Sequence, residues 1–152
     1  MSTFLAPMNY RRARDVLREL DEYAAYSENG AARVRALLAE RYPLVFSRTE
    51  QRVFARGALL LQMQGSNSAD PLVFVSHMDS LHCKEPPLAP DGPITVPLQR
   101  AHVVALLEAL DALLQSGYQP SGELYVALSM DGLSGGEGAQ AMADFLAKRG
   151  VT

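Results

Sequence analysis

The sequence contains very little cysteine and no concentration of positive charge. Cys83 is the single cysteine among 152 residues, so a disulfide framework within the chain is excluded and a reducing compartment is the simplest expectation. The 14 Lys and Arg residues form no cluster, and the net charge is -3. Because nucleic acids and anionic membrane surfaces are bound through basic patches, the composition predicts neither kind of partner.

Long hydrophobic runs are also missing. Residues 1–10 lack the basic start and sustained apolar core of a secretion signal, and no apolar stretch approaches the roughly 20 residues of a membrane span. The sequence therefore predicts a soluble, cytoplasmic protein. Its length fits a single domain, 1–152, with enough residues to bury a core. There is no internal repeat and no low-complexity segment.

The first third of the chain has the hydrophobic spacing of helices. Residues 11–25 carry an apolar stripe at helical spacing, and a second helix with the same kind of stripe ends at Pro43. The stripes consist of Ala13, Val16, Leu17, Leu20 and Ala24 in the first helix and of Val34, Leu37 and Leu38 in the second. Short strands are expected next, over residues 44–46, 53–54 and 58–63, followed by a turn at 65–70.

The second part of the chain alternates buried strands with amphipathic helices. LVFV (residues 72–75) is rich in β-formers and has no polar residue, which predicts a buried central strand. A proline-rich loop leads into a long helix over residues 96–116. LYVAL (124–128) predicts the next buried strand, and SGGE (134–137) has capping-box spacing and opens a last helix through Lys148. This alternation favours a three-layer α/β/α sandwich with a mixed, mainly parallel sheet.

Polar side chains follow both predicted buried strands, at the sheet edge where ligands bind in folds of this class. SHMD (76–79) follows the first strand, and SMDGLSGG (129–136) follows the second. His77 and Asp79 are one residue apart, so on an extended segment their side chains point to the same side. An imidazole can ligate zinc while a carboxylate fixes its tautomer through the other ring nitrogen. The alternative is that both side chains satisfy loop backbone at the strand end.

Three segments, taken together, match the pattern of one enzyme family. They are ALLLQMQGSNSAD, the adjoining PLVFVSHMDSL, and the stretch from Ala101 to Val151. Their order and spacing resemble the zinc exopeptidases of the carboxypeptidase S, aminoacylase and dipeptidase type. The resemblance runs from Tyr42 to Val151 and implies the N-terminal part of a catalytic domain, without the family's lid domain. It also implies that His77 matches a metal ligand and that Asp79 matches the aspartate that supports this ligand.

Other positions depart from the family pattern. The family's bridging aspartate, in a GRGxxDxK pattern, aligns with Leu98, and the lysine of that pattern aligns with Arg100. In the family's DEExGG pattern, Gly132 replaces the general base and Leu133 replaces a metal-binding glutamate. Leucine has no donor atom, glycine takes no proton from water, and a catalytic zinc usually has three protein ligands. No catalytic residue is therefore assigned, although Asp79 matches a family position. The family's later acidic ligand and final histidine have no counterpart.

Additional polar residues leave a second interpretation open. His82 and Cys83 closely follow the HxD segment, and His102 lies in the first turns of the long predicted helix. In one interpretation His77, Asp79 and His82 form an improvised metal site, and Cys83 and His102 are further candidate ligands. In the other they are ordinary loop and helix residues, because no regular ligand spacing connects them.

Two further patterns carry no catalytic signal. The glycine-rich segment 131–136 lacks P-loop spacing and a lysine, and its Ser134 lies in SxGG rather than in the GxSxG of a nucleophile elbow. We therefore expect a turn into a capped helix. Four acidic residues are expected to be solvated surface charges, namely Glu85, Asp91, Glu108 and Asp111.

Two functional hypotheses follow. The first is a pseudoenzyme: a catalytically inactive relative or fragment of a zinc-dependent metallopeptidase or N-acyl amino acid hydrolase, with no cofactor, serving as a binding or structural module. The second is a metallohydrolase that uses zinc on small peptides or N-acyl amino acids, through a rearranged site or as part of a longer protein or assembly. A half-domain of this kind is also expected to leave a sheet edge uncovered, which favours a homo-oligomer.

Overall fold

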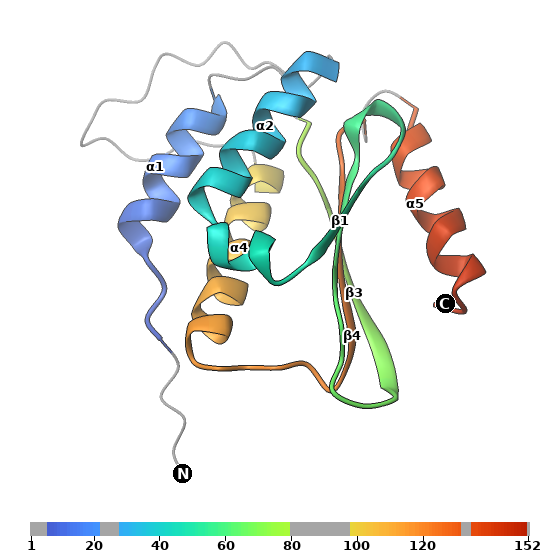
Figure 1. Cartoon of the computed structure of the whole chain (residues 1–152). Coiled ribbons are helices and arrows are strands. Elements are labelled where there is room, and N and C mark those ends of the chain that lie inside the picture. Colours follow the sequence, from blue (N-terminus) through green and yellow to red (C-terminus); the bar gives the residue numbers. More distant parts are fainter. Residues whose placement is uncertain (1–5, 22–27, 80–97, 132–134, 152) are drawn as a thin grey trace.

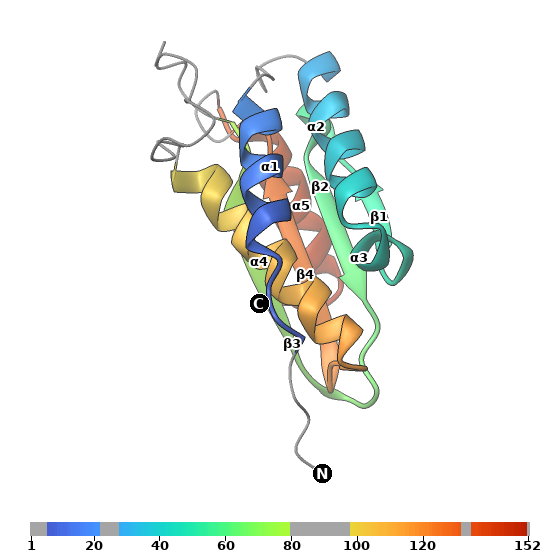
Figure 2. The same cartoon turned by 90° about the vertical axis from the view of Figure 1, so that its left-hand side faces the viewer.

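The chain folds into three layers, with a four-stranded sheet between two layers of helices (Figure 1). The computed structural model describes residues 6–21, 28–79, 98–131 and 135–151. Its elements are α1 (Tyr10–Asp21), α2 (Glu28–Arg41), α3 (Pro43–Ser47), β1 (Glu50–Val53), a 3-10 turn (Ala55–Gly57), β2 (Leu59–Met63), β3 (Ala69–His77), α4 (Leu98–Gln115), β4 (Gly122–Ser129) and α5 (Glu137–Lys148). Helices α1, α2 and α4 cover one face of the sheet, and α5 covers the other (Figures 1 and 2).

The strands lie in the order β1-β2-β4-β3. β3 and β4 are parallel neighbours, with Phe74 opposite Val126, which confirms the predicted pairing of the two apolar segments. The sheet is mixed, as expected. It is not mainly parallel, because the pairs β1–β2 and β2–β4 are antiparallel. The connection between β1 and β2 is only the turn over residues 54–58, and so short a link reverses the chain direction.

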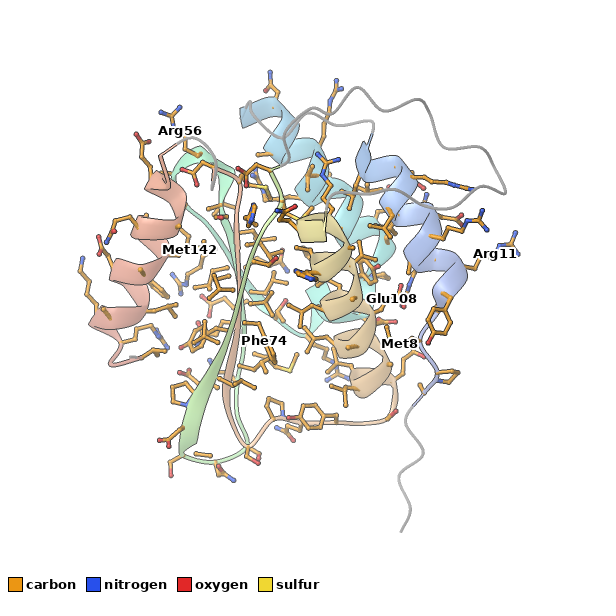
Figure 3. The ribbon with its side chains drawn as sticks, turned by 180° about the vertical axis from the view of Figure 1, so that it is seen from behind. Met8, Arg11, Arg56, Phe74, Glu108 and Met142 are labelled. Carbon is orange, nitrogen blue, oxygen red and sulfur yellow. The ribbon has the colours of Figure 1, made fainter. Side chains whose placement is uncertain are left out.

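The described residues form two buried apolar clusters, one on each face of the sheet. Alternate residues of a strand point to opposite faces, so successive residues of β2 and β4 serve different clusters. The first cluster packs Leu59, Leu61, Leu124, Val126 and Leu128 against α1, α2 and α4. The second packs Leu60, Tyr125 and Ala127 against Met142 and Leu146 of α5. Figure 3 shows Met142 on the side of α5 that faces the sheet.

Strand β3 differs from the expectation for residues 72–75, because it is an edge strand and not a buried central one. Val75 is 75% exposed, Leu72 52% and Phe74 38%. The central position belongs to β4, whose residues are nearly all buried. An uninterrupted apolar run indicates that a strand favours burial, but it does not show whether another element is present to cover the strand.

Two other local expectations changed. Residues 44–46 are helical, in α3, and not a strand, because Pro43 occupies a first-turn position that suits it and Val45 and Phe46 are buried. Helix α5 has Gly136 as its N-cap, in a left-handed conformation and without a side-chain cap. Ser134, the expected cap, lies outside the described residues, as do residues 22–27 and the predicted loop at 80–95. None of the helices in the described ranges is long and apolar enough to span a membrane.

Candidate functional site

The two candidate segments leave the sheet at the same edge. His77 is the last residue of β3 and lies opposite Ser129, the last residue of β4. The main-chain N–H of Met78 continues the ladder by donating to the carbonyl oxygen of Ser129 at 2.9 Å. Because the strands are parallel, Asp79 and Asp131 both follow them beyond this edge, as the sequence predicts. Gly132, the other residue of that prediction, lies outside the described residues.

His77 and Asp79 are in direct contact. The Nδ1 atom of His77 lies 3.0 Å from Oδ1 of Asp79. The Asp79 side chain is fully buried, whereas that of His77 is 31% exposed. Because Nδ1 is engaged by the carboxylate, Nε2 is the ring atom that remains suited to a ligand. The HxD spacing therefore produces an oriented, partly accessible imidazole.

Arg100 of α4 holds the main chain of this segment. Its side chain is buried, with 2% exposure, although α4 begins only two residues earlier. The guanidinium donates from Nε to the carbonyl oxygen of Met78 at 3.3 Å, and from Nη1 to the carbonyl oxygen of Leu20. It thus connects the residue between His77 and Asp79 to the last turn of α1. Sequence reasoning missed this role, and its only signal is a cation at the start of an apolar helix.

Asp131 serves mainly to begin α5. Its side chain is 2% exposed, and Oδ2 accepts a hydrogen bond from the N–H of Gly138 at 2.9 Å. Its carbonyl oxygen accepts another from the N–H of Gly136 at 3.1 Å. These bonds satisfy main-chain donors at the helix N-terminus, which otherwise lack partners. Oδ1 of Asp131 has no hydrogen-bond partner among the described residues.

The donor groups of the described residues do not fit a two-zinc centre. Within those ranges, no three His, Cys, Asp or Glu side chains are placed to hold one metal ion. His102 is exposed on α4. The aligned bridging position, Leu98, has no donor atom. The remaining candidates lie outside the described residues, namely His82, Cys83, Gly132 and Leu133.

A second group of charged side chains lies between α1 and α4, and it corrects an expectation. Glu108 and Asp111 are buried, at 1% and 2% exposure, and are not solvated surface charges. Arg12 of α1 bonds to Glu108 at 2.7 and 2.8 Å and to Asp111 at 2.7 Å. The Arg12 guanidinium also lies over the ring of Tyr42, 4.8 Å from its centroid. Glu85 and Asp91, predicted with them, lie outside the described residues.

The pKa values in this group follow from burial and ion pairing. Burial alone raises the pKa of Glu108, but the hydrogen bonds from Arg12 and from the main-chain N–H of Asn9 outweigh it and bring the pKa below its usual value. The hydrogen bond to Glu108 raises the pKa of Arg12. Burial, together with the nearby Glu108 carboxylate, raises the pKa of Tyr42. The group is therefore ionised at Arg12 and Glu108 at neutral pH and connects α1 firmly to α4.

One described pocket lies away from the His77 edge. It has a volume of about 370 Å³, and Met63, Leu114 and Tyr118 contribute to its lining. Met63 lies opposite Leu124, near the beginning of β4, whereas ligands in sheets of this kind bind beyond the carboxyl ends of the parallel strands. The pocket therefore adds nothing to the candidate site.

Comparison with known proteins shows similarity at the level of the fold. No protein-family model and no curated protein matches the sequence. Among solved structures, aminopeptidase PepT from Bacillus cereus has a TM-score of 0.65 and 19% identity over 88% of this chain and 40% of its own. A tripeptidase from Staphylococcus aureus has a TM-score of 0.65 and 19% identity over 88% of this chain and 39% of its own. A glutaminyl cyclase from an Acidobacteriales bacterium has a TM-score of 0.59 and 14% identity over 99% of this chain and 57% of its own.

These comparisons place the chain in a class of α/β domains that also carries peptidases. The chain spans about 40% of the length of the two peptidases. At identities below 20% the shared property is the fold. The names include two peptidases and a cyclase, so the fold alone does not select the reaction, and function has to be argued from the site.

Proposed function

We propose that this chain is a catalytically inactive relative, or part, of the zinc-dependent peptidases and N-acyl amino acid hydrolases, and that it serves as a binding or structural module in the cytoplasm. The observation that carries the proposal is the isolated position of His77. It is oriented by Asp79 as a zinc ligand would be, yet no second and third donor join it among the described residues. The fold similarity to two peptidases supports the ancestry.

The replaced residues explain why hydrolysis is not expected. Two zinc ions at close range repel each other, and a bridging carboxylate offsets this repulsion. Leu98 supplies none, and Leu133 removes another anionic ligand. Gly132 leaves the position of the general base empty, and loss of a general base alone typically costs about a hundred- to ten-thousand-fold in rate. Without the metal, no activated water is available.

One observation favours a second candidate, a zinc metallohydrolase acting on small peptides or N-acyl amino acids. The contact between His77 and Asp79 is intact, and His77 is partly exposed at the sheet edge where such a site would lie. Under this alternative, His82, Cys83 or residues from a longer protein or an assembly complete the ligand set.

Metal content and turnover distinguish the two candidates. The purified protein is stripped with a chelator, titrated with zinc by calorimetry, and assayed with and without zinc on dipeptides, tripeptides and N-acyl amino acids. His77→Ala is compared with His102→Ala, which removes an exposed histidine on α4. We expect no zinc-dependent turnover in any of the three proteins. Turnover that is lost in His77→Ala and kept in His102→Ala overturns the proposal and establishes the metallohydrolase.

A further inference from the structure

The pocket of about 370 Å³ lies at the end of the sheet opposite to His77. Its walls come from the ends of α3, β1, β2 and α4 and from the segment between α4 and β4. Figure 2 shows the end of β2 and the C-terminal end of α4 at the lower end of the sheet, and the carboxyl ends of β3 and β4 at the upper end. Pockets that bind small molecules measure roughly 300–1,000 Å³, so this one is large enough for a ligand of its own.

One wall of the pocket is apolar and firmly held. Met63 and Pro120 are buried, and Leu114 packs against the larger apolar cluster. Beside them lies Tyr118, whose side chain is 42% exposed although its ring is large and mostly apolar. A ligand that covers this ring and the adjoining side chains removes apolar surface from water, which is favourable. The wall therefore favours a ligand with an apolar body.

The rim of the pocket carries polar groups that have no partner among the described residues. The exposed side chains of Arg48, Gln64 and Gln119 form no hydrogen bond or ion pair with any residue in the described ranges. Arg48 is nevertheless fixed in position, because its main-chain N–H caps the end of α3. Glu50, the acidic residue of the lining, is already paired with Arg52. The rim thus presents a cation whose charge no described residue neutralises.

We propose that this pocket binds a small organic monocarboxylate with an apolar body. Arg48 binds the carboxylate, and the body lies against Leu114 and Tyr118. A guanidinium offers two parallel N–H donors that match the two oxygens of a carboxylate, and such charge-assisted bonds are about twice as strong as neutral ones. Burial of the apolar body adds affinity in proportion to the area removed from water. Because no residue of the His77 edge takes part, this site is separate from the one considered above.

The charges around the pocket favour one negative charge on the ligand and not two. Arg48 neutralises a single carboxylate. A phosphate monoester carries a charge of about −1.5 to −2 at neutral pH, so part of it would remain unpaired at a rim that also holds Glu50. Gln64 and Gln119 add no charge, and their amides can donate and accept hydrogen bonds from a neutral polar substituent. Charge complementarity therefore selects a monocarboxylate.

The first test titrates the full chain with phenylbutyrate and octanoate, two monocarboxylates with apolar bodies, and follows the main-chain amide resonances by NMR. Phenylbutanol is the uncharged counterpart, and phenylbutyl phosphate is the dianion. Both carboxylates should shift the resonances of Gln64, Gly117 and Gln119, which lie in the pocket. The alcohol and the phosphate should bind about tenfold more weakly, because each lacks the matched ion pair. Absence of binding by both carboxylates up to millimolar concentrations overturns the proposal, as do shifts centred on His77 or an equal affinity for the alcohol.

The second test removes the cation. Arg48→Gln should weaken the binding of phenylbutyrate about tenfold and leave that of phenylbutanol unchanged, because only the carboxylate is paired with the guanidinium. Arg33→Gln is the matched control, since Arg33 is exposed on α2 and does not line the pocket. Circular dichroism checks that both variants are folded. Binding of phenylbutyrate that survives Arg48→Gln, or that Arg33→Gln weakens equally, overturns the proposal.

The third test removes the aromatic side chain of the wall. Tyr118→Ala should weaken phenylbutyrate and phenylbutanol alike, because both lose the same apolar contact. Tyr10→Ala is the matched control, since Tyr10 is 78% exposed on α1 and should affect neither ligand. Unchanged binding in Tyr118→Ala contradicts the proposed position of the apolar body. None of the three tests depends on the chemistry at His77, so their failure would leave the function proposed above unaffected.

Discussion

The guanidinium of Arg12 and the carboxylate of Glu108 are joined by two hydrogen bonds, from Nε to Oε1 at 2.7 Å and from Nη2 to Oε2 at 2.8 Å. The Glu108 side chain is 1% exposed, and that of Arg12 is 22% exposed. A carboxylate buried to this extent is stable only with a partner, because its removal from water is costly. The fold is therefore stable only when α1 packs against α4, because this packing brings Arg12 to Glu108.

Removal of Arg12 should destabilise the fold strongly. Arg12→Ala leaves Glu108 buried without its partner, and breaking a buried pair from one side typically costs about 3–5 kcal/mol. Arg11→Ala is the matched control, because Arg11 is exposed on the same helix and such changes usually stay within about 0.5 kcal/mol (Figure 3). Urea unfolding followed by circular dichroism measures both. Equal stability of the two variants would show that the pair contributes little.

Stability should also fall at acidic pH because of Glu108. Its pKa in the folded protein is below its ordinary value of 4.5. Its contribution is therefore fully present above pH 4.5 and is lost as pH falls from there through the lower folded pKa. Unfolding free energies measured from pH 7 to pH 3 should decline in that window, and Glu108→Gln should flatten the decline. Glu123, whose pKa is lowered chiefly by the hydrogen bond from Tyr125, accounts for part of the remaining slope. An unchanged profile in Glu108→Gln would contradict the assignment.

Arg100 should control both stability and the environment of His77. Arg100→Met has a side chain of similar length but removes the donors to the carbonyl oxygens of Leu20 and Met78. Leaving such acceptors buried without partners typically costs about 1–3 kcal/mol. The imidazole resonances of His77 should shift in the NMR spectrum, whereas those of His102, exposed on α4, should not. Identical His77 resonances in the variant would show that Arg100 does not position this segment.

Gly138 should resist substitution even though it lies in a helix. A Cβ at this position would lie 2.7 Å from the carbonyl oxygen of Ala55 and 2.7 Å from Cβ of Ala58. Gly138→Ala should therefore destabilise by about 1–3 kcal/mol through overpacking, although alanine favours helix. Gln140→Ala, at an exposed position two residues later, serves as the control. Thermal melts compare the two, and a stabilised Gly138→Ala protein would mean that α5 moves outward without penalty.

Hydrophobic spacing alone predicts most of the elements. The stripes of α1, α2 and α4 and the apolar run of β4 are strong local signals, and the strand-helix-strand order predicts that β3 and β4 are parallel. Helix α3 was missed because Leu44, Val45 and Phe46 have no helical signature of their own. Their burial against other elements, not their intrinsic preference, determines the conformation.

The candidate site could be predicted in part for a similar reason. The spacing of His77 and Asp79 predicts their contact, since both side chains leave an extended segment on one side. The role of Arg100 could not be predicted, because its acceptors are main-chain carbonyl oxygens. Every residue has such a group, so no residue type in the sequence identifies them. The burial of Glu108 and Asp111 was missed because their partner, Arg12, lies 96 and 99 residues away along the chain.

The order of the strands has a consequence for how the chain is made. β4 lies between β2 and β3, yet it follows both in the sequence. As the chain leaves the ribosome, β2 and β3 emerge before β4. Until β4 has emerged, the edges of β2 and β3 that pair with it remain uncovered. Pairings between distant segments form slowly and are the ones exposed to aggregation. Nascent chains that stop before residue 122 should therefore depend most on chaperones, and the sheet should close only when Gly122–Ser129 has been synthesised.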